Sequence, residues 1–287
     1  MANRKNYIKS KIDKVRPKKL LVARKGFLFT IILIILFCLG IYFSLFFQGI
    51  QIKNVFISGN QQVLTEDINN FVLNKVRINI IKIGNWDLHS DSIVFANNDK
   101  IAKSILENFS AIKGVEIKKS LFSQNIFINL SERTVFAIFC PTAVVERSSC
   151  YFMDENGVVF ESTDKISQNM IVVRHFLSDP QVFAGEQVIQ QNIMNLIAKV
   201  ENDLQSNFQI SLKDAFITSP FRLDVKTTEN WKIYFDLNVN SDINSQVTKL
   251  NLLLGGQITP EDRKNLRYID LRPRDRAIVC DNNVCGG

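Results

Sequence analysis

The sequence predicts an α+β protein with a single N-terminal transmembrane helix, a β-α-α-β-β module, and then a mixed β-rich domain with two packed helices. Three observations predict this fold class. Residues 27–47 contain no charged residue, strand-like and helix-like patterns alternate in the next stretch, and short strands and turns dominate the remainder. The expected segments are a basic arm at 1–26, the helix at 27–47, the module at 51–133, the β-rich domain at 134–280 and a tail at 281–287.

The segment at 27–47 has the length and apolarity of a membrane-spanning helix. About 20 apolar residues in a helix cross a hydrocarbon core of about 30 Å. A signal peptide has a shorter apolar core and a small-residue cleavage site, and the exit sequence SLFFQGIQIK offers no such site. A buried core helix would show polar positions at a helical period. We therefore expect an uncleaved anchor.

Charge predicts the orientation of this anchor. Residues 1–26 hold ten Lys or Arg residues against one Asp, a net charge of +9; the whole chain carries +7, so residues 27–287 carry −2. Because basic flanks stay in the cytoplasm, the N-terminus is expected inside and the rest of the chain exported. A basic chain can indicate nucleic-acid binding. Here the excess lies beside the membrane, where lysines meet anionic lipid, so no nucleic-acid partner is expected.

The module at 51–133 follows from local patterns. Residues 51–60, QIKNVFISGN, alternate apolar and polar side chains and then reach a Ser-Gly-Asn turn, which predicts a strand. Thr65 opens a helix, and a second helix is predicted at 97–109. Between them we expect a short extended piece over Ile78–Ile83 and a loop over GNWDLHSDS. Two strands then close the module, at 112–118 and 125–132.

Strands and hairpins dominate after Arg133. Helices are predicted at Glu186–Leu204 and Asp242–Leu254, and the terminal segment Arg267–Val279 is strand-like on both sides of Pro273. The other expected strands are 135–140, 150–153, 158–161, 170–173, 209–212, 221–227 and 231–237.

Four of the five cysteines lie outside the membrane segment, which contains Cys38. An even number in an exported region permits two disulfides, and closeness in sequence favours Cys140 with Cys150 and Cys280 with Cys285. The alternative is four small buried thiols in an envelope that does not oxidise them.

No constellation predicts catalysis. The sequence contains no C-x-x-C, G-x-S-x-G, H-E-x-x-H or phosphate-cradling glycine loop, and His89 and His175 stand alone. A carboxylate pair for glycoside hydrolysis is defined by separation in space, which a sequence does not give. The carboxylates considered are Asp87, Asp91, Asp154 and Glu155. We expect no enzyme, no cofactor, no metal and no small-molecule substrate.

Four segments, in this order behind the anchor, carry a resemblance to the FtsQ/DivIB family of bacterial cell-division proteins. Residues 52–60, IKNVFISGN, resemble the first strand of a POTRA domain, with Gly59 at the turn. Ser131-Glu132-Arg133 with Ala137 resembles a Glu-Arg-x-Pro-x-Ala junction. YFMDENGVVF at 151–160 and YIDLR at 268–272 resemble the family's hairpin and terminal strand. Two departures stand out: Val135 replaces the junction proline, and Pro273 interrupts the terminal strand.

The resemblance implies a POTRA domain at 51–133 and a non-catalytic bitopic scaffold in the cytoplasmic membrane at the division septum. It implies binding to FtsB/DivIC-like and FtsL-like division proteins, and through them control of septal peptidoglycan synthesis by FtsW and FtsI. In the family, FtsB adds to an edge strand near the C-terminus, which is β-augmentation.

The terminal strand is expected at that edge because no later segment is long enough to cover it, because Pro273 suits an edge, and because arginines discourage uncontrolled pairing. The alternative is that the arginines only keep an idle edge soluble. The predicted partner-binding residues are Asp270, Leu271, Arg272, Arg274, Asp275, Arg276, Ala277, Ile278 and Val279.

Two other functions remain open from the sequence. A POTRA-containing export or outer-membrane assembly protein would usually carry a β-barrel of many strands of about 10 residues, and residues 134–287 have too few. A membrane-anchored cell-wall hydrolase would require paired acids in a deep groove.

Overall fold

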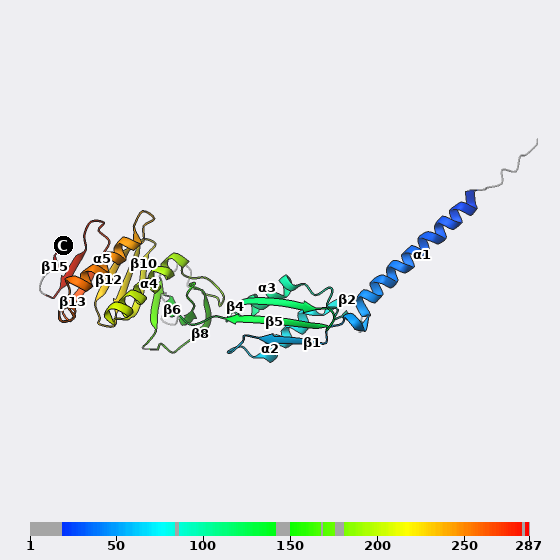
Figure 1. The fold of residues 1–287 in the computed structure, drawn as a ribbon, viewed down its shortest axis with the longest axis horizontal. Helices are drawn as coiled ribbons and strands as arrows, with labels where there is room; N and C mark the ends of the chain where they lie inside the picture. The colour runs from blue at the N-terminus through cyan, green and yellow to red at the C-terminus, as the bar shows by residue number, and fades with distance from the viewer. Residues whose placement is uncertain are drawn as a thin grey trace, which may run out of the picture. The chain divides into compact units, whose positions relative to one another are not determined.

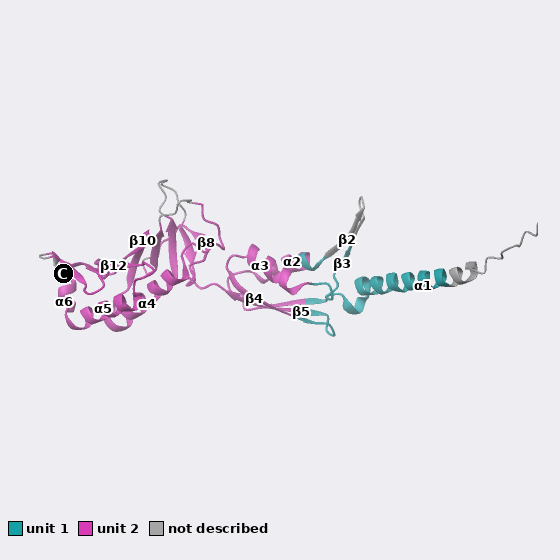
Figure 2. Cartoon of the chain, turned by 90° about the horizontal axis from the view of Figure 1, so that it is seen from above, with its two compact units in different colours: residues 1–54, 75–96, 119–126 teal, residues 55–74, 97–118, 127–287 magenta. Residues whose placement is uncertain are grey.

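The computed structural model describes residues 19–83, 86–141, 150–167, 169–175, 181–282 and 285–286. Its helices and strands are labelled in Figure 1, and Figure 2 shows the two compact units into which the chain divides. Unit 1 holds residues 1–54, 75–96 and 119–126, and unit 2 holds residues 55–74, 97–118 and 127–287. The domain boundaries expected from the sequence stay a prediction.

Unit 1 contains the apolar helix. Helix α1 spans Lys19–Phe46, and its apolar part, Gly26–Phe46, has side chains that are not buried by the protein. This exposure suits a helix whose solvent is lipid. The helix ends one residue before the expected Phe47 and begins inside the expected basic arm, of which residues 1–18 lie outside the described residues. A short 3-10 helix, η1 (Gln48–Ile50), follows.

Unit 1 also contains a hairpin where the sequence predicted one extended piece and a loop. Strands β2 (Ile78–Ile83) and β3 (Trp86–Ser90) pair antiparallel, from Ile78 opposite Ser90 to Ile83 opposite Trp86. The loop prediction for GNWDLHSDS is therefore wrong over Trp86–Ser90, whereas its first two residues, 84 and 85, lie outside the described residues. Its Gly-Asn start is a two-residue hairpin signal, and Trp and Leu then alternate with polar residues, a strand pattern that the polar composition concealed.

The β-α-α-β-β order is confirmed, with the hairpin inserted between the two helices. The strands form a three-stranded sheet in the order β1-β5-β4. The bounds are β1 Asn54–Ser58, α2 Thr65–Val76, α3 Asn98–Asn108, β4 Ile112–Ser120 and β5 Asn125–Glu132. Asn97 caps α3 by accepting the Lys100 N–H at 3.0 Å. Gly59 has φ +86°, and a Cβ there would lie 2.0 Å from the Leu130 carbonyl oxygen, so this turn requires glycine.

After Arg133, unit 2 contains a ten-stranded sheet in the order β15-β14-β13-β12-β11-β10-β9-β6-β7-β8. Three neighbouring pairs are parallel: β6 with β9, β9 with β10, and β12 with β13. The strands are β6 Ala137–Pro141, β7 Cys150–Met153, β8 Val159–Thr163, β9 Ile171–His175, β10 Leu212–Ser219, β11 Arg222–Thr227, β12 Lys232–Asp236, β13 Leu266–Asp270, β14 Ile278–Asp281 and β15 Cys285–Gly286.

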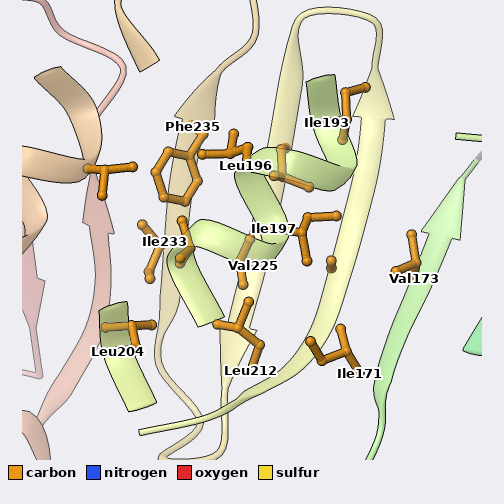
Figure 3. Close-up of a cluster of buried hydrophobic side chains, with 14 of the residues drawn as sticks. Ile171, Val173, Ile193, Leu196, Ile197, Leu204, Leu212, Val225, Ile233 and Phe235 are labelled. Atoms are coloured by element: carbon orange, nitrogen blue, oxygen red, sulfur yellow. The ribbon is translucent and has the colours of Figure 1, made fainter. Parts of the chain in front are cut away.

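Helices make the crossovers for two of these three parallel pairs. Helix α4 (Gln191–Phe208) joins β9 to β10, and α5 (Ile243–Gly256) joins β12 to β13 before the short α6 (Pro260–Arg263). Figure 3 shows apolar side chains of α4 meeting those of the sheet. The labelled members of this core are Ile171, Val173, Ile193, Leu196, Ile197, Leu204, Leu212, Val225, Ile233 and Phe235.

Helix α4 begins five residues later than the predicted Glu186. The backbone before it is already engaged by β8: the Gly185 N–H donates to the Val159 carbonyl at 2.6 Å, and the Val159 N–H donates to the Glu186 carbonyl at 3.0 Å. Ile189 is fully packed in the core although it lies outside the helix. Apolar spacing therefore predicted its burial but not its conformation.

Candidate partner-binding site

The predicted edge strand, Asp270–Val279, is two strands with a loop between them. Strand β13 ends at Asp270, residues 271–277 form the loop, and β14 starts at Ile278. Strand β13 lies inside the sheet, because β12 pairs with one side of it and β14 with the other. The prediction that Asp270–Val279 belongs to a single terminal edge strand, interrupted by Pro273, is wrong. Pro273 stands in the loop rather than in a strand.

The sheet edge lies one strand further along, at β14 and its short cover. Strand β15 pairs with β14 at only two positions, Val279 with Gly286 and Cys280 with Cys285. In the described part of the chain, no strand pairs with Ile278 on that side. The start of β14 therefore presents backbone groups to which another extended segment can add.

A lysine from α5 organises the loop before β14. The Lys249 ammonium donates to three loop carbonyls: Leu271 at 3.0 Å, Pro273 at 2.5 Å and Arg276 at 3.2 Å. Burial lowers the pKa of Lys249, although Asp275 and Asp270 act against this shift. Three carbonyls around one ammonium hold residues 271–276 in a fixed turn, which explains why the strand does not continue.

Arg272 lies on the open face of the sheet rather than at its edge. Its guanidinium makes a two-pronged contact with Asp270, at 2.8 and 2.6 Å, and lies 5.5 Å from the centre of the Tyr234 ring. Arg222 lies over the same ring at 4.8 Å and binds Asp224 in the same manner. Burial would raise the pKa of Asp270, but the hydrogen bonds from Arg272 outweigh it and lower that pKa.

All three predicted arginines are exposed, but only Arg272 is paired with a described carboxylate. Arg274 and Arg276 are exposed, and neither forms an ion pair with a described residue. Beside them, a hollow of about 240 Å³ lies between the start of α5 and the loop. Its lining includes Asp242, Ser245, Lys249, Pro273 and Arg274. A second, shallower hollow adjoins Arg272, Asp270 and Asp236.

Sequence reasoning missed Tyr234, Asp236 and Lys249. Tyr234 had a usable signal, because it alternates with the buried Ile233 and Phe235 on β12 and so must lie on the opposite face. No sequence signal indicated the role of Lys249, since the carbonyls it binds are more than twenty residues away in sequence.

The junction residues of the family resemblance also have clear structural roles. The Glu132 carboxylate accepts the N–H groups of Gln61, Gln62 and Val63 at 2.9–3.0 Å. Burial would raise the pKa of Glu132, but these backbone hydrogen bonds outweigh it and lower that pKa. Glu132 therefore fixes the turn after β1 to the end of β5.

Arg133 makes the next contact. Its Nη1 lies 2.6 Å from Oδ2 of Asp154, and its Nε donates to the Ser110 carbonyl at 3.0 Å. The other Asp154 oxygen accepts the Asn156 and Val158 N–H groups, which closes the β7–β8 turn. Gly157 in this turn has φ +77°, and a Cβ there would lie 2.3 Å from the Ile189 carbonyl oxygen.

The structure joins the same cysteines that sequence spacing favoured. The sulfurs of Cys140 and Cys150 lie 2.08 Å apart, and Cys280 is joined to Cys285 across the β14–β15 hairpin. Cys38 is free on α1. Within the described residues, no group of three or more His, Cys, Asp or Glu side chains could hold a metal ion.

Part of the chain matches a known protein family. Residues 143–272 match the family model described as the C-terminal part of the cell division protein FtsQ/DivIB. The match spans both crossover helices and ends in the loop at Arg272. No curated protein matches the chain. Residues 143–272 are thus similar to the FtsQ/DivIB family, and the described part of the chain contains one helix, Gly26–Phe46, that is long and apolar enough to span a membrane.

Proposed function

We propose that this chain is a non-catalytic scaffold of the bacterial division machinery, anchored in the cytoplasmic membrane with its N-terminus in the cytoplasm. It binds FtsB/DivIC-like and FtsL-like proteins and so helps control septal peptidoglycan synthesis by FtsW and FtsI. The match of residues 143–272 to the family carries this proposal.

The test of this role is depletion combined with localisation. A fluorescent fusion should gather at the septum of dividing cells, and depletion should give filaments without septa. Lysis or a secretion defect with septa still forming would contradict the role.

The proposed orientation rests on the charge of +9 over residues 1–26, which precede most of the apolar part of α1. A membrane-impermeant thiol reagent should label Lys103→Cys, an exposed position on α3, in intact spheroplasts. It should label Ser10→Cys only after lysis. Labelling of Ser10→Cys in intact spheroplasts would reverse the topology.

The partner-binding surface we propose is the outer side of β14 together with the loop at 271–277. A partner strand adds beside Ile278 through backbone hydrogen bonds, and its acidic side chains face Arg274 and Arg276. Three features support this surface: the two-residue cover of β14, the unpaired arginines, and the hollow against α5.

Proline substitution tests the backbone part of this surface. Ala277 precedes β14, so Ala277→Pro removes a donor and redirects the chain at the start of the edge while leaving the β13–β14 register residues intact. We expect loss of FtsB/DivIC pull-down with an unchanged circular dichroism spectrum. Ile166→Pro is the matched control, because Ile166 is exposed in a loop after β8. Undiminished pull-down by folded Ala277→Pro would place the partner elsewhere.

A further inference from the structure

The last turn of α1 is capped by side chains from the segment that follows it. The final carbonyls of a helix have no partner within the helix. Here the Ser44 carbonyl accepts the Ser92 hydroxyl at 3.0 Å. The Leu45 carbonyl accepts both the Gln51 amide at 2.6 Å and the Ser90 hydroxyl at 2.5 Å. The helix end and the chain beyond β3 are thus one hydrogen-bonded body within unit 1.

Two loops are held against the residues that leave the helix. The Ile93 N–H donates to the Ile50 carbonyl at 2.9 Å, which fixes the loop at 92–96. The Gln124 amide donates to the Gly49 carbonyl at 2.9 Å, which fixes the β4–β5 turn at 120–124. Because the apolar part of α1 ends at Phe46, both loops lie at the level where this helix leaves the bilayer.

Lys119 joins the two loops to each other. Its ammonium donates to the Ala96 carbonyl at 2.6 Å and the Ile93 carbonyl at 3.4 Å. The lysine that directly precedes the second loop is thus engaged by backbone carbonyls. The loops themselves, SIVFA at 92–96 and SLFSQ at 120–124, contain no charged residue.

The tips of these loops carry exposed apolar side chains. Phe122 is fully exposed, and Val94, Phe95 and Leu121 are between 46% and 53% exposed. A single exposed apolar residue on a protein surface is ordinary. Four of them on two linked, charge-free loops at the end of a membrane-spanning helix form a surface, which we call the 94/122 surface.

We propose that the 94/122 surface docks into the leaflet from which α1 emerges, with lipid as its partner. Apolar and aromatic side chains in this position bury themselves about 5–10 Å into the boundary between headgroups and acyl chains. Phe and Leu, with Trp, are the side chains that form the buried face of segments lying in the membrane interface. The same bilayer covers α1 and the loops, so the occupant follows from continuity with the helix. The protein is then held at two points, which fixes the tilt of unit 1 on the membrane.

Tryptophan fluorescence in brominated lipid tests this docking on the full-length chain in liposomes. Phe122→Trp keeps an aromatic side chain at a fully exposed position, so folding is not disturbed. The emission of the parent chain, with its two tryptophans, is subtracted. Phe183→Trp is the matched control, because Phe183 is also an exposed phenylalanine and lies outside unit 1.

Bromines placed near the headgroups should quench the emission added by Phe122→Trp several-fold more than the emission added by Phe183→Trp. Bromines near the bilayer centre should quench Phe122→Trp less than the shallow ones do. Because both variants carry the same preference of tryptophan for interfaces, a difference between them reports position. Equal quenching of the two variants by shallow bromines would overturn the proposal.

Discussion

Two arginine–aspartate pairs have the same closest distance and opposite surroundings. Arg133 with Asp154 and Arg272 with Asp270 each bring nitrogen and oxygen to 2.6 Å. The side chains of the first pair are 14% and 1% exposed, and those of the second are 38% and 10% exposed. Distance alone would rank them equal. Their burial assigns the first pair to the fold and the second to the surface that a partner can reach.

The neighbours of each pair support this division. The partners of Arg133 and Asp154 are backbone groups of neighbouring turns, so the pair locks chain segments together. Arg272 instead lies over Tyr234 beside an open hollow, where an incoming carboxylate could share it. Breaking the first pair should damage stability, and changing charges near the second should damage binding.

The largest effect is expected from Asp154→Ala. This change leaves a largely buried guanidinium without its carboxylate and frees two N–H groups, so we expect a loss of about 3–5 kcal/mol of unfolding free energy. Urea denaturation of the full-length chain measures it. Asp270→Ala is the control, with an expected loss of about 1 kcal/mol because that pair is partly solvated. Equal losses would remove the distinction between the two pairs.

The two disulfides should differ in the same way: breaking the first should reduce stability, and breaking the second should reduce partner binding. The expected loss of stability is somewhat smaller than for Asp154→Ala. Both pairs should be found oxidised by non-reducing peptide mapping of protein from the envelope, and four free thiols would contradict this. Cys140→Ser should cost about 2–3 kcal/mol of unfolding free energy, since it opens a short loop within the sheet. Cys285→Ser frees only the two-residue β15, so partner pull-down should change more than stability.

Charge reversal beside the second pair should give an effect on binding alone. Arg274→Glu with Arg276→Glu should weaken partner affinity up to about thirtyfold at low salt, because exposed pairs contribute about 0.2–1 kcal/mol each. Screening within about 10 Å at 0.1 M salt should shrink the difference. Lys165→Glu with Lys213→Glu is the matched control on exposed lysines elsewhere. A salt-independent loss would point to misfolding of the loop.

The sequence predicted what local periodicity controls. The bounds of β5 and β7 agree with the structure, and α1 was evident from its lack of charge. What failed depends on distant partners. The start of α4 shifted because β8 takes the backbone of residues 185–187, and the terminal strand breaks because Lys249 gathers three carbonyls. The arginines of the candidate site were visible in the sequence, but the fixed loop that presents them was not.

The smallest effect concerns acid. The pKa values of Asp270 and Glu132 lie below those of the free side chains, because hydrogen bonds to the ionised forms outweigh the opposing effect of burial. A lowered pKa in the folded state means that each carboxylate contributes stability above its unfolded pKa, about 4, and loses it as the pH falls through the folded value. Unfolding free energy should therefore be constant from pH 7 to about 5 and decline below that.

Two variants test which carboxylates cause this decline. Asp270→Asn should make the decline shallower, because the side chain that Arg272 contacts at position 270 can then no longer be protonated in this pH range. Glu132→Gln should also do so, while lowering stability at pH 7 through the weaker acceptor it offers to Gln61, Gln62 and Val63. The measurement is urea denaturation at a series of pH values, with Glu107→Gln as the control on an exposed helix position. If the unfolding free energy of both variants and of the control falls with pH at the same slope, other carboxylates dominate the acid response. Asp270 and Glu132 would then make no separate contribution to the pH dependence of stability.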